Sequence, residues 1–158
     1  MKYLLTVLAV TGVMNLNVHA QESMMNIAND IIGLTSDYNM AWESLDMDSV
    51  ATFHSEDFTY YWKGSLSVTS NKAFVEGYKK IMSNAAKWTM YIDNLQVQVL
   101  DENNVIIGFD ISETELILKD GTELDYGIGA MTYFWHRRDG EWKLVHIHES
   151  AKEKDTEH

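Results

Sequence analysis

The strongest constraint on the fold is the separation of two patterns, with helical periodicity in the first half of the chain and strand alternation in the second. Apolar residues recur in steps of three and four, at positions 24, 27, 31, 34, 38, 41 and 45. This spacing predicts one long helix that is buried along one face. From residue 95 onward, "LQVQVL" (95–100) and much of "VIIGFDISETELIL" (105–118) alternate between apolar and polar residues. Alternation of this kind predicts long, half-buried strands.

Shorter elements are expected between these two regions. A second helix is predicted at 47–54, with Asp46 as its N-cap. The aromatic stretch "DFTYYW" (57–62) is typical of a strand. Ser70 can cap a third helix that has three large apolar side chains on one face: Phe74, Tyr78 and Ile81.

This order of elements predicts an α+β fold. The turn signals "DENN", "KDGT" and "RDG" separate long strands, the last of which begins near Glu141. A single sheet must wrap the long N-terminal helix so that both can bury their apolar faces. Strands of about a dozen residues also twist too strongly to stay flat. We therefore expect a cone-shaped, curved antiparallel sheet around the helix, with a pocket at its mouth.

The first twenty residues resemble a secretory signal peptide. Lys2 precedes an apolar run at 3–13, and Val18-His19-Ala20 places small residues one and three positions before a cleavage point. The alternative is a buried or anchoring N-terminal helix. We expect cleavage near Ala20 and export to the periplasm or the medium, which leaves a domain at 21–150 and a polar tail at 151–158.

Composition restricts the partners. The chain has 24 acidic and 12 basic residues and a formal net charge of −12, which argues against nucleic acid and against anionic membrane surfaces. It contains no cysteine, so disulfides are excluded and stability must come from packing.

The stretch "YFWHRRDGEWKLVHIHES" (133–150) predicts a hairpin. A three-residue loop at 138–140, with Gly140 in the left-handed position, places Tyr133 opposite Val145 and Gly129 opposite Glu149. Odd-numbered residues then share one face, where Gly127 and Gly129 leave room for a pocket beside Glu149. A two-residue Asp-Gly turn would reverse this assignment. The even face is apolar enough to be an interface with another subunit or a helix, and its candidate residues are Phe134, Trp142, Leu144, His146 and His148.

His146 and His148 also raise the question of a metal site. Two histidines on one strand face can share a metal ion, but zinc requires a third protein ligand. His136 is at the far end of the hairpin, and His54 is on another element. We therefore expect histidines hydrogen-bonded within a sheet or an interface, and no metal or cofactor.

The run "WHRRDGEWKLVHIHES" (135–150) resembles the end of the association (hub) domain of calcium/calmodulin-dependent protein kinase II. That family lies within the superfamily similar to nuclear transport factor 2, which includes the SnoaL-like proteins. The resemblance implies the cone-shaped fold, oligomeric assembly, and a pocket whose arginines bind small carboxylates. Here the arginine positions are occupied by Tyr133, Glu149 and, in a loose alignment, Asp110. Loss of the positive charge predicts a small polar or cationic ligand instead.

Five residues are candidates for the pocket: Tyr60, Trp62, Asp110, Tyr133 and Glu149. The first strand usually borders the pocket in this superfamily, which favours Tyr60 and Trp62. Asp110 interrupts an apolar strand, where burial would raise the pKa of its carboxyl group. The alternative for Asp110 is a solvated position.

Two functions follow from these features. The first is an exported, hub-like, non-enzymatic module that associates with itself as a homo-dimer or larger assembly and holds a small ligand. The second is an isomerase, dehydratase or hydrolase of the SnoaL and ketosteroid isomerase type. In that enzyme, Asp110 or Glu149 would be the general base, and Tyr133 or Tyr60 would donate a hydrogen bond to the developing oxyanion.

Overall fold

The computed structural model describes residues 2–125 and 128–152, and the side chains of residues 20–124 and 128–151. The three described helices are α1 (Lys2–Glu43), α2 (Met47–Phe53) and α3 (Asn71–Met82). The strands are β1 (His54–Trp62), β2 (Ser65–Val68), β3 (Ala85–Asp101), β4 (Asn104–Leu118), β5 (Glu123–Asp125), β6 (Ile128–Arg138) and β7 (Glu141–Lys152). They form one sheet in the order β2-β1-β7-β6-β4-β3, with β5 paired to β4.

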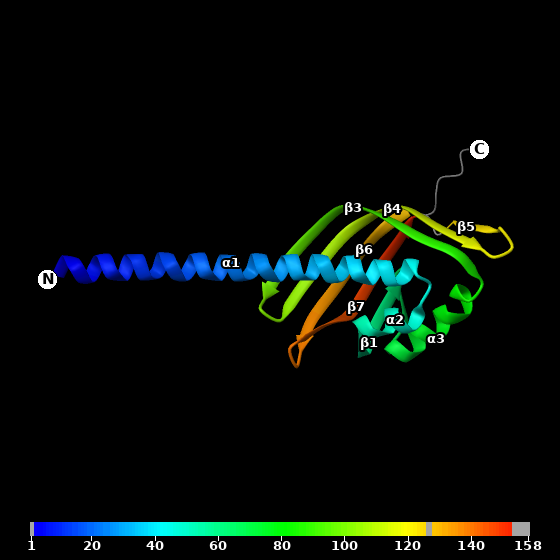
Figure 1. Cartoon of the computed structure of the whole chain (residues 1–158), viewed down its shortest axis with the longest axis horizontal. Helices are drawn as coiled ribbons and strands as arrows, with labels where there is room; N and C mark the ends of the chain where they lie inside the picture. The colour runs from blue at the N-terminus through cyan, green and yellow to red at the C-terminus, as the bar shows by residue number, and fades with distance from the viewer. Residues whose placement is uncertain (1, 126–127, 153–158) are drawn as a thin grey trace.

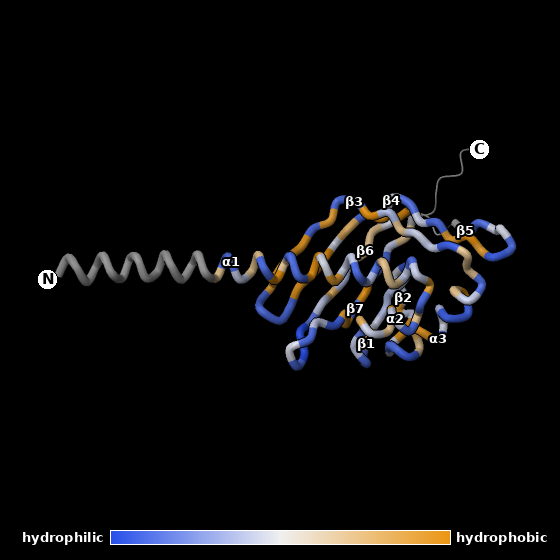
Figure 2. Tube along the Cα trace, viewed as in Figure 1, coloured by the Kyte–Doolittle hydropathy of each residue, from blue (hydrophilic) through white to orange (hydrophobic). Residues whose placement is uncertain are grey.

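The sheet curves around the C-terminal part of α1, and α2 and α3 lie at its β1 end (Figure 1). Ile31 and Tyr38 of α1 are fully buried against inner-face residues such as Ile107 and Trp135. Figure 2 shows apolar residues along β3, β4 and this part of α1, and hydrophilic residues in the turns. The predicted α+β fold is confirmed. The pairing of β1 with β7 is parallel, so the sheet is not antiparallel throughout.

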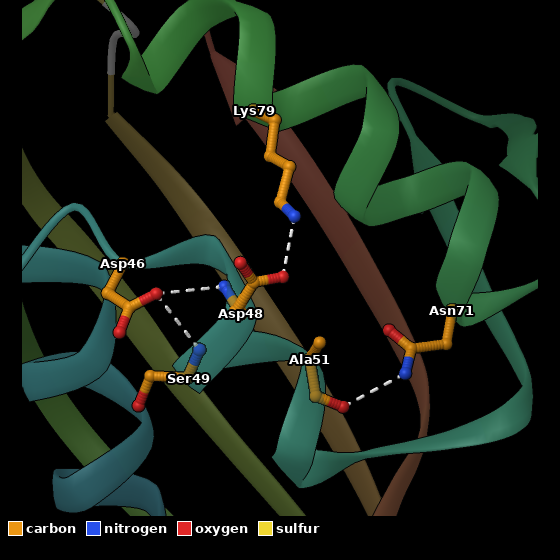
Figure 3. A network of polar contacts seen from close by, with 6 residues as sticks. All are labelled: Asp46, Asp48, Ser49, Ala51, Asn71 and Lys79. Atoms are coloured by element: carbon orange, nitrogen blue, oxygen red, sulfur yellow. Dashed lines mark hydrogen bonds and ion pairs between the residues drawn. The ribbon is translucent and has the colours of Figure 1, made fainter.

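The two predicted helix caps are present. An oxygen of the Asp46 carboxylate accepts hydrogen bonds from the backbone N–H groups of Asp48 (3.0 Å) and Ser49 (3.2 Å), as Figure 3 shows. The Ser70 hydroxyl accepts from the N–H of Ala73 at 3.3 Å. These bonds satisfy N–H groups that the first turns of α2 and α3 leave without a helical partner.

The N-terminal prediction stays a prediction. Helix α1 begins at Lys2, but the side chains of residues 1–19 lie outside those that the structure describes. Over the described part of the chain, no helix is both long and apolar enough to cross a membrane. At the other end, Ala151 and Lys152 belong to β7, and the rest of the predicted tail, 153–158, lies outside the described residues.

The β6–β7 turn differs from the prediction. Arg138 pairs with Glu141, so the loop has two residues, Asp139 (φ 51°) and Gly140 (φ 84°). Positive φ at both positions is the geometry of the type I′ turns that join hairpin strands. A register shift between Phe134 and Trp135 then leaves Val145 as an extra residue in β7.

Beyond this bulge, Tyr133 pairs with Ile147 and Met131 pairs with Glu149. Odd residues therefore still face odd residues, although each pair is displaced by two positions from the predicted one. Tyr133 and Glu149 lie together on the inner face, as expected.

The bulge changes the assignment of two predicted interface residues. Leu144 is fully buried in the core, where it pairs with Trp135. Trp142 also packs against the core, and the Arg137 guanidinium lies 4.6 Å from the centre of its ring. Placing Leu144 and Trp142 on the outer face was wrong because between the turn and the bulge even residues of β7 face inward. Phe134, His146 and His148 remain on the outer face.

Gly129 has a different role from the one predicted. It pairs with Ala151, and a Cβ at this position would lie 2.0 Å from the carbonyl oxygen of Ser150. Glycine is therefore required for the close approach of the β7 backbone rather than for a pocket. Gly127 lies outside the described residues.

Candidate functional site

One cavity lies between α1, α3 and the inner face of the sheet. Its volume is about 140 Å³, and eight of its fifteen lining residues are aromatic. Trp42 of α1, Phe74 of α3 and Trp88 of β3 form apolar walls. Trp62 and Ile81 also line the cavity and are 39% and 36% exposed, which places its opening beside them.

Glu149 is the one carboxylate among the described residues that line the cavity. It is 9% exposed, and its Oε2 accepts a hydrogen bond of 2.5 Å from the Tyr60 hydroxyl. Burial raises the pKa of Glu149 above its ordinary value, and the Tyr60 hydrogen bond and the positive charge of Lys63 oppose this shift. The carboxyl group of Glu149 therefore lies at the edge of an apolar space.

Several tyrosines line the same cavity as this carboxylate. Burial raises the pKa of Tyr60, and the neighbouring Tyr78 and Glu149 raise it further. Burial likewise raises the pKa of Tyr133, and repulsion from the ionised forms of Tyr38 and Glu149 raises it further. The Tyr133 ring meets Phe109 edge to face at 4.9 Å and Tyr38 at 5.6 Å. These phenols are neutral groups that can exchange hydrogen bonds with a ligand.

A chain of polar side chains leads from the cavity into the core. The Tyr38 hydroxyl lies 2.9 Å from Nε2 of His54, and Nδ1 of His54 lies 3.0 Å from Oδ1 of Asn71. His54 is 4% exposed and stacks on Phe58 with ring centres 4.0 Å apart. Burial lowers the pKa of His54 to about 4, so the ring is neutral at neutral pH.

Four of the five predicted pocket residues, Tyr60, Trp62, Tyr133 and Glu149, line this cavity. Asp110 does not. It is exposed, and its carboxylate accepts a hydrogen bond of 2.7 Å from the Asn94 side chain. The neighbouring Phe109 and Ile111 are buried, so strand alternation turns Asp110 outward. Of the two alternatives for Asp110, the structure therefore shows the solvated position and not the buried acid or base.

Sequence reasoning missed the polar chain and most of the aromatic wall. Tyr38 was expected only as part of a buried helix face, and His54 was considered only as a distant metal ligand. The available signal for His54 was its place at the start of an aromatic strand, where a polar ring must find partners inside the core.

The outer-face histidines interact with β1. His146 Nδ1 lies 2.8 Å from the Thr59 hydroxyl, and the Tyr61 ring lies 5.6 Å from His146 and 6.3 Å from His148. Burial and the neighbouring His148 lower the pKa of His146. Within residues 2–125 and 128–152, no group of three or more His, Cys, Asp or Glu side chains is arranged to hold a metal ion.

Comparison with known proteins identifies the fold. Residues 31–152 match the sequence profile of the SnoaL-like domain. LinA, at 16% identity, superposes with a TM-score of 0.69 over 83% of this chain and 89% of its own. A protein of Xanthomonas campestris, provisionally named a calcium/calmodulin-dependent protein kinase II association domain, has 19% identity and a TM-score of 0.64 over 79% and 87%.

A protein of Streptomyces avermitilis, provisionally named a dehydratase of the NTF2-like family, has 13% identity and a TM-score of 0.68 over 80% of this chain and 96% of its own. No curated protein matches the chain. At these identities the similarities establish the fold and no activity. The resemblance to the kinase hub in particular stays a prediction.

Proposed function

We propose that this chain, which belongs to the SnoaL-like domain family, binds a small molecule that combines an apolar ring with a cationic or hydrogen-bond-donating group. The observation that carries the proposal is Glu149, a carboxylate 9% exposed in the wall of an otherwise largely apolar cavity. A carboxylate in such a place is stabilised by every donor or cation that approaches it. The Tyr60 hydroxyl and the charge of Lys63 supply part of this stabilisation, and a positively charged or donating guest would add to it.

The size and the walls of the cavity support the same ligand class. Its volume of about 140 Å³ is close to the roughly 150 Å³ of an engineered apolar cavity that accepts benzene. Aromatic walls such as Trp42 and Trp88 pack well against a ring, and their faces attract a cation. A six-membered ring carrying an ammonium group therefore matches both the space and the charge.

The proposal is tested with two molecules of one ring size and opposite charge, cyclohexylamine and cyclohexanecarboxylate. Calorimetry should detect binding of the amine and weak or no binding of the carboxylate. Glu149→Gln keeps the size of the side chain and removes its charge, so it should reduce affinity for the amine about tenfold or more. Equal binding of the two molecules by the unaltered protein would contradict the proposal.

Glu149→Arg provides the complementary test. It restores positive charge at one of the arginine positions of the kinase hub family and should let the carboxylate bind in place of the amine. Tyr133 remains beside the site in both proteins. If the variant folds and the preference does not reverse, Glu149 does not select the charge of the ligand.

A second function is favoured by one specific observation, the raised pKa of Glu149 beside tyrosine hydroxyls. A carboxylate of this kind is suited to take a proton from a carbon acid while a phenol donates a hydrogen bond to the developing oxyanion. Glu149 would be the base and Tyr133 the donor, because the Tyr60 hydroxyl already donates its hydrogen to Glu149. Hydrogen–deuterium exchange next to the carbonyl of cyclic ketones, followed by NMR, should then be catalysed and should be lost in Glu149→Gln.

Self-association and export belong to the same proposal. We place the contact between subunits on the outer face that contains Phe134, His146 and His148. Size-exclusion chromatography with light scattering at tens of micromolar tests this assembly, and a strict monomer would exclude it. Mass spectrometry of the protein secreted by its host tests cleavage after Ala20, because an intact N-terminus would argue against a leader.

A further inference from the structure

Asn71 sets the direction of the hydrogen bonds behind the cavity. Its Nδ2 donates to the carbonyl oxygen of Ala51 at 2.9 Å, as Figure 3 shows. The other end of the amide, Oδ1, therefore faces His54 and can only accept. Because Nδ1 of His54 lies 3.0 Å from that oxygen, Nδ1 must carry the hydrogen.

The tautomer of His54 then determines whether Tyr38 donates or accepts in their hydrogen bond. A neutral imidazole has one N–H, and here it is on Nδ1, which leaves Nε2 as an acceptor. Nε2 lies 2.9 Å from the Tyr38 hydroxyl, so Tyr38 donates its hydrogen to His54. The Tyr38 oxygen also forms a hydrogen bond with the side chain of Trp42, whose indole N–H can only donate. Toward the cavity that this residue lines, Tyr38 therefore has no hydrogen to offer and can only accept.

Tyr60 is arranged in the same way. It donates its hydroxyl hydrogen to Oε2 of Glu149, so its oxygen, which also hydrogen-bonds with Tyr78, can only accept. Two phenols from different elements, α1 and β1, thus have their hydrogens engaged, and the Glu149 carboxylate that accepts from Tyr60 is also an acceptor when ionised. A ligand that brings an acceptor to any of these atoms would meet lone pairs, whereas a ligand that brings N–H groups can donate to them.

We infer that His54, which does not line the cavity, is a positioning residue that selects hydrogen-bond-donating ligands by holding the Tyr38 hydroxyl hydrogen away from them. This inference rests on the proposed binding function and deepens it. On this inference, the preference for an ammonium group over a carbonyl group has two sources, the charge of Glu149 and the hydrogen bond that His54 accepts from Tyr38.

The inference is tested on the full chain with cyclohexylamine and cyclohexanone, which share a ring but differ in offering donors or an acceptor. His54→Phe removes the acceptor from Tyr38 and retains an aromatic ring against Phe58. The freed Tyr38 O–H can then turn to the ligand. Affinity for the amine should fall, and affinity for the ketone should rise, each by about threefold to tenfold.

Tyr38→Phe and the double variant with His54→Phe are the matched controls. Tyr38→Phe should weaken amine binding without any gain for the ketone, because no hydroxyl remains. The double variant should lose the gain that His54→Phe alone produces for the ketone. A purely structural role of His54 would instead reduce the affinity for both ligands by the same factor and leave their ratio unchanged.

Asn71→Ala is the second route if His54→Phe does not fold. Asn71 is half-buried at the start of α3, and without its oxygen the His54 hydrogen is free to move to Nε2, where it donates to Tyr38. The ratio of ketone to amine affinity should again rise, and an unchanged ratio would overturn the inference. If the unaltered protein binds no amine, the proposed function itself fails. If it binds amine through Glu149 and the ratio never shifts, only the role of His54 fails.

Discussion

Acidification is expected to destabilise this protein through His54. The side chain is 4% exposed and is in contact with Tyr38, Phe58, Phe74 and Asn71. None of these four described neighbours carries a charge at neutral pH, so a positive charge on the ring has no compensation. Burial accordingly lowers the pKa of His54 from 6.5 to about 4.

The direction of this pH effect on stability follows from proton binding by the folded and unfolded protein. The unfolded chain takes up a proton near pH 6.5, whereas the folded protein takes it up only near pH 4. The stability that neutral His54 contributes is therefore complete above the unfolded pKa and is lost as the pH falls toward the folded pKa. Since one pKa unit corresponds to about 1.4 kcal/mol, lowering the pH from about 7 to about 5 should reduce the free energy of unfolding by about 2 kcal/mol.

Glu149 affects the pH dependence of stability in the opposite direction, so its contribution must be removed before that of His54 is measured. Its raised pKa means that the folded protein binds a proton more readily than the unfolded chain, so acidification stabilises the fold at this site. The measurement therefore uses Glu149→Gln as its background. Urea unfolding is followed by tryptophan fluorescence at the two pH values. It gives the fall in the free energy of unfolding between them for Glu149→Gln and for the double variant Glu149→Gln with His54→Phe.

The added His54→Phe should abolish most of the loss of about 2 kcal/mol, whatever it does to stability at neutral pH. Asn71→Asp is a second check, because a carboxylate that accepts from Nδ1 favours the charged ring and should also reduce the pH dependence. If the free energy of unfolding falls equally with and without His54, the reasoning is refuted and other groups take up the proton.

Four further substitutions test stability, and each is measured by urea unfolding. Gly129→Ala should cost about 1–3 kcal/mol because its Cβ would lie 2.0 Å from the Ser150 carbonyl oxygen. Gly77→Ala on α3 should instead stabilise the protein by about 0.5–1 kcal/mol, because no described atom lies within 4 Å of its Cβ. Leu144→Ala should cost about 2–5 kcal/mol because this side chain is fully buried in the core. Arg138→Ala breaks an exposed pair with Asp57 and should cost less than about 1 kcal/mol.

The elements that could be predicted are those with a strong local signal. Periodicity indicated α1 and β4, and the caps Asp46 and Ser70 marked the starts of α2 and α3. Strand β2 (Ser65–Val68) was missed because it is mostly exposed and needs no apolar alternation. The parallel pairing of β1 with β7 joins segments more than eighty residues apart, and no local pattern encodes it.

Prediction of the candidate site depended on assigning each strand residue to the inner or the outer face of the sheet. Alternation in "IIGFDIS" places Ile107, Phe109 and Ile111 inward and Asp110 outward, so the signal against a buried Asp110 was available in the sequence. The roles of Tyr38 and His54 could not be obtained in this way. They depend on two side chains from different elements meeting at 2.9 Å, which only the packing of α1 against β1 determines.

Glu149 reaches the cavity because of an irregularity in the sheet. A two-residue turn alone would have put it on the outer face, away from Tyr60, and the extra Val145 in β7 restores it to the inner face. The parallel partner is irregular at the same level, since the β1–β7 register shifts between the pair His54–Leu144 and the pair Thr59–His146. His54 and Glu149 therefore lie on either side of one break in regular pairing, and bulges of this kind change the direction in which a strand's side chains point.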